Sequence, residues 1–308
     1  MAPKVWGRPQ PAPILWSKTL SRAFVTVVDL GSYTRAAEAL GRTQPAVSLQ
    51  IRRLEELLQS TLLRVEGRQV RLTDAGLALG PHARQMLRLN DDIIAHFAEE
   101  SLSGWIKVGL PTDFSHTFLL TTISRFAATH PQVRIEVESR ISSELRKDLA
   151  ADRLDLILAI AGSGQPSENQ DAFLVSSTSV QPFWAVAEQF VWSPREPLPI
   201  VRHPDPCEYA ERMRSALRLS RKTWRTVMIA RDVAGLQAAI IAGLGVSAMT
   251  PATLSDGMRI GTPEEGFPAL APLRIGLFYK HARLTKAGHG LAQWLVERIE
   301  EAGGGASR

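Results

Sequence analysis

The chain has 308 residues, of which 44% are hydrophobic and 22% charged, proportions typical of a globular protein with about two or three domains. This composition excludes a disordered, collagen-like or fibrous chain, and no stretch approaches the about 18 consecutive apolar residues of a membrane helix. The first 13 residues contain four prolines and no continuous apolar run. We therefore expect residues 1–16 to be a flexible extension and not a secretory signal. The single cysteine, Cys207, cannot form an internal disulfide, which fits a reducing cytoplasm.

Positive charge is concentrated near the N-terminus. Residues 1–73 contain eleven Lys or Arg and five Asp or Glu, a net charge of +6, whereas residues 74–308 contain 25 and 26, a net charge of −1. A small basic module joined to a neutral body indicates a polyanionic partner for that module. Charge alone does not distinguish DNA from RNA or from an acidic membrane, and a basic face that is merely solvated is the plainer alternative.

The first segment predicts three short helices. Ser17 is a suitable N-cap for the first helix, and Gly31-Ser32 ends it. Thr34 is expected to cap a second helix over residues 35–40, which Gly41 closes. The third helix begins at Thr43 or Gln44, and its inner face is one apolar stripe made of Val47, Ile51, Leu54 and Leu58.

The outer face of the third helix is polar and basic, and a tight turn over residues 41–43 joins it to the second helix. This arrangement is typical of a helix-turn-helix, although any small helical bundle could show it. Residues 62–72 then form two strand-like runs around Glu66-Gly67. They predict a hairpin wing with Arg68 near its tip, so that residues 17–73 form a winged helix-turn-helix.

A long helix is predicted from Thr73-Asp74 to about Glu100. Leu79, Met86 and Ile93 recur every seven residues along it, with Asn90 as a polar position in the same seam. We expect residues 74–100 to be a linker and dimerisation helix. Burial of the seam against the rest of its own chain is the alternative.

Strands and helices alternate after Trp105. Strands are predicted over 106–110, 133–139 and 154–160, with helices over 118–129 and 142–151 between them. This order favours an α/β domain with a parallel sheet. The later elements continue the alternation, with a helix near Glu208, a strand near Val227, a helix over 233–242, a strand over 273–279 and a helix over 284–301.

No convergent set of catalytic or metal-binding residues stands out. The seven histidines are scattered without metal-ligand spacing, and there is no Gly-x-Ser-x-Gly elbow or phosphate-binding loop. Residues 243–248 fit the loose dinucleotide pattern Gly-x-Gly-x-x-Ala, but they follow a helix and enter a strand, the reverse of what a dinucleotide requires. We expect no catalytic residue, no metal and no cofactor. Cys207 is interpreted as a small hydrophobic residue, with a redox role at a helix N-terminus as the alternative.

Two long segments resemble the LysR-type transcriptional regulators. The first runs from Phe24 through Gly31-Ser32-Tyr33-Thr34-Arg35-Ala36-Ala37 and Thr43-Gln44-Pro45-Ala46-Val47-Ser48 to Leu54-Glu55, and the second runs from Val70 to Gly76. Residues 154–156 and 242–246 match points in the effector domain of that family, and the resemblance extends from about Leu20 to Ala302. The chain departs from the pattern at Gln59, where the family usually has glycine, at Leu62-Leu63, where it has Leu-Phe, and at Val65, where it has arginine.

The resemblance implies a multi-domain α/β protein. After the winged helix-turn-helix and the linker helix comes a periplasmic-binding-protein-like effector domain over residues 101–302, with one subdomain over about 104–162 plus 273–302 and another over about 163–272. The implied function is sequence-specific transcriptional regulation modulated by a small co-inducer or co-repressor. The implied partners are a double-stranded DNA operator, a second copy in a homodimer or homotetramer, and RNA polymerase, without a membrane. A solute-binding protein and an α/β enzyme with an appended basic domain are the alternatives.

The third helix supplies the predicted DNA contacts. Gln44 can form a bidentate pair of hydrogen bonds with adenine. Ser48 can contact a base or a phosphate, and Arg52 can contact a guanine or a phosphate. Phosphate contacts are expected from Arg35, Arg42 and Arg53, and a minor-groove contact from Arg68 on the wing. The predicted DNA-binding set is Arg35, Arg42, Thr43, Gln44, Pro45, Ser48, Arg52, Arg53 and Arg68.

The predicted effector site lies beyond the carboxyl ends of two strands, where ligands bind in open parallel sheets. Hydroxyl-bearing loops follow these strands at 111–115 and 140–143, and the second loop begins a helix whose N-terminus favours an anion. The resemblance adds the loop around His203 and Met249-Thr250 across a cleft. The predicted effector-binding set is Thr112, Asp113, Ser115, Ser142, Ser143, His203, Met249 and Thr250. This set suggests an anionic or hydrogen-bond-accepting metabolite. For Ser142 the alternative role is simply to cap its helix.

Overall fold

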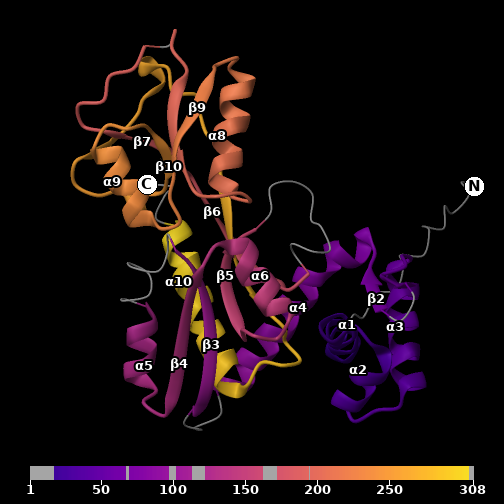
Figure 1. Ribbon diagram of the computed structural model, residues 1–308. Helices are drawn as coiled ribbons and strands as arrows, with labels where there is room; N and C mark the ends of the chain where they lie inside the picture. Colours follow the sequence, from indigo (N-terminus) through magenta and orange to yellow (C-terminus); the bar gives the residue numbers. More distant parts are fainter. Residues whose placement is uncertain are drawn as a thin grey trace, which may run out of the picture.

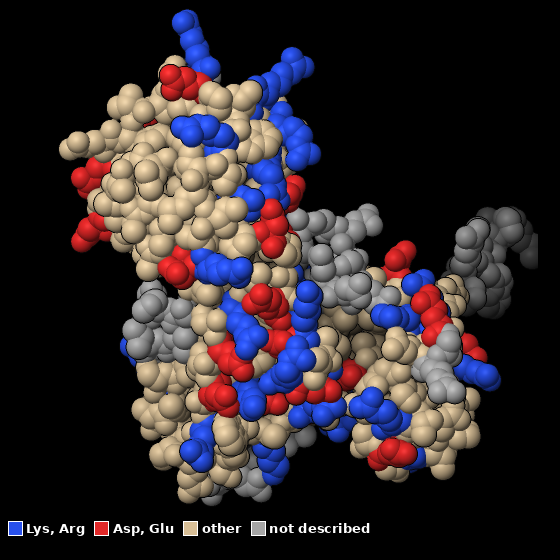
Figure 2. Space-filling view, in the orientation of Figure 1, with Lys and Arg blue, Asp and Glu red and all other residues tan. Residues whose placement is uncertain are grey.

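A computed structural model of the chain describes residues 17–66, 69–96, 102–112, 122–161, 172–193 and 195–304. Figure 1 shows a helical N-terminal domain beside the lower of two stacked α/β subdomains. No helix in the described ranges is long and apolar enough to cross a membrane. On the face seen in Figure 2, acidic and basic side chains are interspersed over the lower subdomain, as expected for the nearly neutral part of the chain.

The N-terminal domain contains α1 (Lys18–Leu30), α2 (Tyr33–Ala39) and α3 (Gln44–Leu58), followed by the antiparallel hairpin of β1 (Leu63–Glu66) and β2 (Gln69–Leu72). Ser17 caps α1 as predicted. The predicted cap of α2 at Thr34 is wrong. Ser32 has the extended backbone that an N-cap requires, and its hydroxyl accepts a hydrogen bond from the Arg35 N–H, so α2 begins two residues earlier than expected.

The end of α3 explains one departure from the family pattern. Gln59 caps the helix in the left-handed region, with φ of 50° and ψ of 37°. Glycine adopts this conformation without steric cost, whereas other residues are strained there. The chain thus keeps the left-handed helix end at which the family usually has glycine, although glutamine occupies the position.

Helix α4 (Asp74–His96) divides the predicted heptad seam in two. Leu79 and Ala83 are buried in the core of the N-terminal domain, together with Leu87. Farther along, Leu89 is 52% exposed and Ile93 is 62% exposed. The first half of the seam therefore packs inside the chain, and only the second half leaves apolar surface open. Residues 97–100, the predicted end of this helix, lie outside the described residues.

The first subdomain is built on a five-stranded sheet. Its order is β4 (Val133–Arg140), β3 (Gly104–Pro111), β5 (Leu156–Ile160), β12 (Leu273–Tyr279) and β6 (Leu174–Val180). Strand β3 is parallel to β4 and β5, but β12 is antiparallel to both of its neighbours. The sheet is therefore mixed and not wholly parallel, because β12 enters it on the way back from the second subdomain. Strand β6, which was expected in the second subdomain, also belongs to this sheet.

Helices cover both faces of that sheet. Helices α5 (Ser124–Thr129) and α10 (Lys286–Gly304) pack on one face, where Phe126, Leu291 and Leu295 are buried. Helix α6 (Ser142–Ala150) packs on the other face through Leu145 and Leu149. The predicted helix over 118–129 overlaps α5, and its first part lies outside the described residues. These three layers fix α6 with its N-terminus at the edge nearest the second subdomain (Figure 1).

The second subdomain has the same layered plan. Strands β10 (Ser247–Met249), β7 (Phe183–Ala187) and β11 (Met258–Ile260) form one sheet, and β8 (Leu198–Arg202) and β9 (Trp224–Ile229) form another. A bridge between Ile200 and Val246 links the two sheets. The helical elements are α8 (Glu208–Leu219), α9 (Val233–Ile241) and the 3-10 turns η2 (Pro251–Thr253) and η3 (Pro263–Glu265). Because α9 ends at Ile241 and β10 begins at Ser247, with Gly243 between them at φ of +73°, this glycine-rich segment is a helix-to-strand turn.

A buried ion pair joins the N-terminal domain to the first subdomain. Arg84 of α4 donates to Asp29 of α1 at 2.6 Å, and both side chains are almost fully buried. The same guanidinium donates to the backbone carbonyl of Ala172 at 3.0 Å, while the Asp29 carboxylate accepts the Ala282 N–H at 3.0 Å. Each member of the pair therefore also holds a segment of the first subdomain.

Candidate DNA-binding face and effector cleft

Six of the predicted DNA contacts lie on α3 or at its N-cap, and Arg35 of α2 and Arg42 of the connecting turn precede them. Thr43 is the N-cap, and its hydroxyl accepts from the Ala46 N–H at 3.4 Å. The Gln44 amide Nε2 donates to Ser48 Oγ, one turn later, at 2.9 Å. This bond holds together two groups that can each read a base edge. The remaining exposed members of the predicted set are Arg35, Arg42, Pro45, Arg52 and Arg53.

The apolar stripe is what turns this face outward. Val47, Ile51 and Leu54 are fully buried against α1 and α2, so residues on the opposite side of the helix meet solvent. Leu49 lies there with 66% exposure and is absent from the predicted set. An exposed leucine beside polar readers suits contact with a thymine methyl group. Arg68 lies outside the described residues.

A cleft between the two subdomains brings together four of the predicted effector residues: Thr112, Ser142, Ser143 and His203. Its empty volume, including the open mouth, is about 720 Å³, which is within the range of small-molecule sites. Asp113 and Ser115 lie outside the described residues. The cleft therefore contains hydroxyl groups from the first subdomain and an imidazole from the second.

Met249 and Thr250 do not line this cleft. Met249 is buried in the apolar core that contains Leu236 and Ile240 of α9, and Thr250 is also fully buried. The reason is that Met249 of β10 packs under α9, while Thr250 is held in the tight turn of η2 by hydrogen bonds with Thr253. Both side chains are therefore covered in this structure, and their contact with an effector stays a prediction.

Ser142 does not cap its own helix. The N-cap of α6 is Ile141, which offers no side-chain acceptor. Ser142 Oγ instead accepts the N–H of Ile160, at the end of β5, at 3.0 Å. A hydroxyl that accepts one bond can still donate its own hydrogen. Ser142 thus fixes the cleft wall and retains a donor.

Two helix N-termini meet at the cleft. Helix α6 begins there, and so does α8, whose N-cap Cys207 likewise provides no side-chain hydrogen bond to the helix. The first-turn N–H groups of a helix and its dipole favour negative charge. Arg146, one turn into α6, also lines the cleft and donates to the Ile160 carbonyl oxygen. The acidic side chain at the cleft, Glu208, is paired with Arg212 at 2.9 Å. Among the described lining residues, the positive groups are therefore not balanced by an unpaired carboxylate.

The loop before α8 is held by ion pairs. Asp205 contacts Arg202 at 3.1 Å and Arg214 at 2.9 Å, and the hydrogen bond from Arg214 lowers the pKa of the Asp205 carboxyl. His203 Nδ1 lies 2.9 Å from the Ala230 carbonyl oxygen, so this nitrogen donates and Nε2 is the acceptor in the neutral ring. These contacts fix the second-subdomain wall of the cleft.

Arg146, Cys207 and Tyr209 line the cleft but are missing from the predicted set. Arg146 had a local signal, because it is four residues after Ser142 and so lies on the same face of the helix. Cys207 and Tyr209 reach the cleft only through the packing of the second subdomain, and no local pattern marks them.

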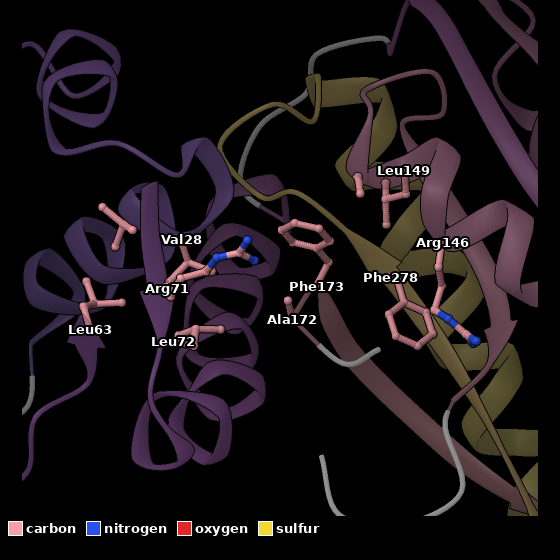
Figure 3. A pocket seen from close by; sticks show the side chains of 11 residues that line it. Val28, Leu63, Arg71, Leu72, Arg146, Leu149, Ala172, Phe173 and Phe278 are labelled. Carbon is pink, nitrogen blue, oxygen red and sulfur yellow. The ribbon is translucent and has the colours of Figure 1, made fainter. Parts of the chain in front are cut away.

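A second cavity, of about 770 Å³ including its mouth, lies between the wing and the first subdomain. Figure 3 shows Val28, Arg71 and Leu72 on one side of it, Arg146 and Phe278 on the other, and Phe173 between them. Arg146 therefore lines both cavities. Helix α6 extends from the cleft between the subdomains to the cavity beside the wing.

Comparisons with known proteins agree with this architecture. Residues 19–77 match the bacterial regulatory helix-turn-helix protein model of the lysR family, and residues 99–302 match the LysR substrate binding domain. The chain is 31% identical over 306 residues to the HTH-type transcriptional regulator CfxR of Cupriavidus necator, covering 90% of each chain. It is 29% identical over 258 residues to the HTH-type transcriptional regulator PecT of Dickeya dadantii, covering 84% of this chain and 80% of the relative.

The fold is also found in a solved structure. The full-length regulator LysG of Corynebacterium glutamicum with bound effector arginine aligns with a TM-score of 0.50 at 15% identity, covering 93% of this chain and 99% of that one. The two family matches together span the described domains, from α1 to α10. The chain belongs to the LysR family of DNA-binding transcriptional regulators.

Proposed function

We propose that this regulator binds its operator through α3 as a dimer or tetramer, and responds to an anionic or hydrogen-bond-accepting metabolite in the cleft between its subdomains. The observation that carries the proposal is the meeting of two uncapped helix N-termini with Arg146 in that cleft. Each helix N-terminus contributes about 0.3–1 kcal/mol to anion binding at an exposed site, and up to about 2 kcal/mol when partly buried.

Helix α6 is the proposed route between the effector and the DNA-binding domain. Ser142 and Ser143 lie at the cleft, whereas Leu149 and Ala150 line the cavity beside the wing. A ligand that draws the N-terminus of α6 toward the second subdomain also moves its C-terminus relative to β2. Effector binding and operator binding are thereby coupled through one rigid element.

The exposed end of α4 supports the proposed dimer. Leu89 and Ile93 are one turn apart and form an apolar strip on this helix. A second copy of α4, packed against the strip, removes it from water and supplies the two-fold symmetry of an inverted-repeat operator. Replacing Leu89 and Ile93 together with glutamate is expected to give monomers in sedimentation and to abolish tight operator binding. Sedimentation of this variant as a dimer would place the interface elsewhere.

RNA polymerase is the further proposed partner, which the protein contacts once it is bound to its operator.

The cleft assignment can be tested once the operators are known. Mapping the binding sites across the genome identifies the neighbouring genes, whose metabolites are then titrated calorimetrically. Ser142→Ala, Thr112→Val and Arg146→Met are expected to weaken binding of the true effector, with no loss of operator affinity when effector is absent. Arg125→Met, an exposed substitution on α5, is the matched control. A normal dose-response in all three cleft variants would contradict the assignment.

A further inference from the structure

Three side chains with metal-binding groups meet where α4 joins the first subdomain. Asp91 comes from α4, His281 from the turn after β12, and His289 from the first part of α10. One potential ligand atom from each lies within 4.8 Å of the others. His281 Nε2 is 3.2 Å from Asp91 Oδ2, and the two imidazole rings are 4.6 Å apart between centroids. Only the tertiary fold brings these residues together.

Neighbouring groups orient the three side chains toward one another. The Asn90 amide donates to Asp91 Oδ1 at 2.9 Å, and Arg22 Nη2 lies 3.5 Å from the same oxygen, so Oδ2 faces the histidines. A ring N–H of His289 donates to the backbone carbonyl of His281. Imidazoles that bind metals are typically held in this way, with the second nitrogen donating to a carbonyl or carboxylate.

His281 has an unmet hydrogen-bonding group. The side chain is more than nine-tenths buried, and its Nδ1 has no hydrogen-bond partner among the described residues. A buried polar atom without a partner is costly, so the hydrogen bonds within the described residues do not fully satisfy this ring, whose other nitrogen, Nε2, faces Asp91. Tyr279 stacks beside this ring at 6.3 Å between centroids and closes one side of the cluster.

We propose that Asp91, His281 and His289 form a binding site for a divalent transition-metal ion of the Zn²⁺ class. Two imidazoles and one carboxylate suit Zn²⁺, Co²⁺ or Ni²⁺, whereas Ca²⁺ and Mg²⁺ prefer sites made of oxygen. Tetrahedral coordination with bonds of about 2.0–2.1 Å separates ligand atoms by about 3.3 Å. The Asp91–His281 pair already has this spacing, and side-chain rotation brings in His289. Water completes the coordination.

Metal binding at this site ties the linker helix to the first subdomain. Asp91 belongs to α4, two residues before the exposed Ile93, while both histidines belong to the segment that carries β12 into α10. The bound ion is thus a cross-link between two parts of the chain that are far apart in sequence. Arg22 opposes the cation electrostatically, but its side chain is 41% exposed and can turn into solvent.

The test uses the full-length chain after dialysis against EDTA, titrated with ZnCl₂ by calorimetry. We expect one Zn²⁺ per chain with micromolar or tighter affinity, and binding of CoCl₂ at the same site with the visible absorption of four-coordinate Co²⁺. His289→Gln and Asp91→Asn each remove one ligand at a half-buried position and are expected to weaken Zn²⁺ binding by about 100-fold or more. Circular dichroism establishes that both variants are folded.

His82→Gln is the matched control, because His82 lies exposed on the same helix α4, outside the cluster. It should bind Zn²⁺ like the parent chain. Zn²⁺ should also slow amide exchange at residues 86–96 in the parent chain but not in His289→Gln. Absence of Zn²⁺ binding in the parent chain, or unchanged affinity in both ligand variants, overturns the proposal. This test involves neither DNA nor effector, so it stands apart from the proposed function.

Discussion

Helices α3 and α6 both present polar groups for binding, but they do so in opposite ways. Helix α3 buries Val47, Ile51 and Leu54 and leaves its reading face in solvent, where Gln44 and Ser48 bond to each other. Helix α6 places Ser142 and Arg146 in a cleft, where both also bond to Ile160 of β5. The proposed DNA-reading groups can therefore change without cost to the fold, whereas the proposed effector-binding groups also hold the fold together.

The strongest loss of stability is expected from breaking the buried ion pair that joins the N-terminal domain, which carries α3, to the first subdomain, which carries α6. Arg84→Met leaves the buried Asp29 carboxylate without its partner, and losing one member of a buried pair costs about 3–5 kcal/mol. Urea unfolding measures this loss. The control is Arg22→Met, which breaks an ion pair on the same helix interface that is substantially exposed, and an exposed pair contributes about 1 kcal/mol or less. Equal losses in the two variants would show that Asp29 and Arg84 are not the tie between the domains.

Gln44→Ala tests the exposed side of the comparison. Loss of a bidentate base contact costs about 1–3 kcal/mol of binding at the cognate operator and little on random DNA. Thermal stability should not change, because the Gln44 side chain is exposed and bonds only to Ser48 in the described structure. Fluorescence anisotropy measures the affinity for both DNAs, and a melting curve of the free protein measures its thermal stability. A similar loss on random DNA would show that Gln44 does not read sequence.

Ser142→Ala tests the buried side. It removes the acceptor of the Ile160 N–H, so we expect a loss of about 1 kcal/mol in unfolding free energy together with a weaker effector response. Ser143→Ala is the neighbouring control for the stability measurement, since it leaves that bond in place. A Ser142→Ala protein that is as stable as the parent chain would contradict the dual role given to this hydroxyl.

The same contrast explains which features could be predicted from the sequence. The buried stripe of α3 and the bounds of β12 at 273–279 follow from local periodicity, and the structure has both. The antiparallel direction of β12, the place of β6 in the first sheet and the burial of Met249 depend on pairing between distant segments, which periodicity does not encode. The meeting of Asp91 with His281 is of the same kind. Thr112, Ser142 and Ser143 were predictable as cleft residues because each follows a strand or begins a helix, whereas His203 was expected there only from the family resemblance.

The mildest change concerns a single backbone conformation in the DNA-binding domain. Gln59 ends α3 at φ of 50° with an exposed side chain, so replacing it loses no packing. Glycine relieves the left-handed strain of about 1–2 kcal/mol but adds freedom to the unfolded chain worth about 0.4–1 kcal/mol. Gln59→Gly should therefore stabilise the protein by roughly 0.5–1 kcal/mol, measured as a shift of the urea midpoint. Gln59→Ala keeps a Cβ at the same φ and should give no gain. A gain with alanine would mean that the Gln59 side chain, and not its backbone conformation, is the unfavourable feature.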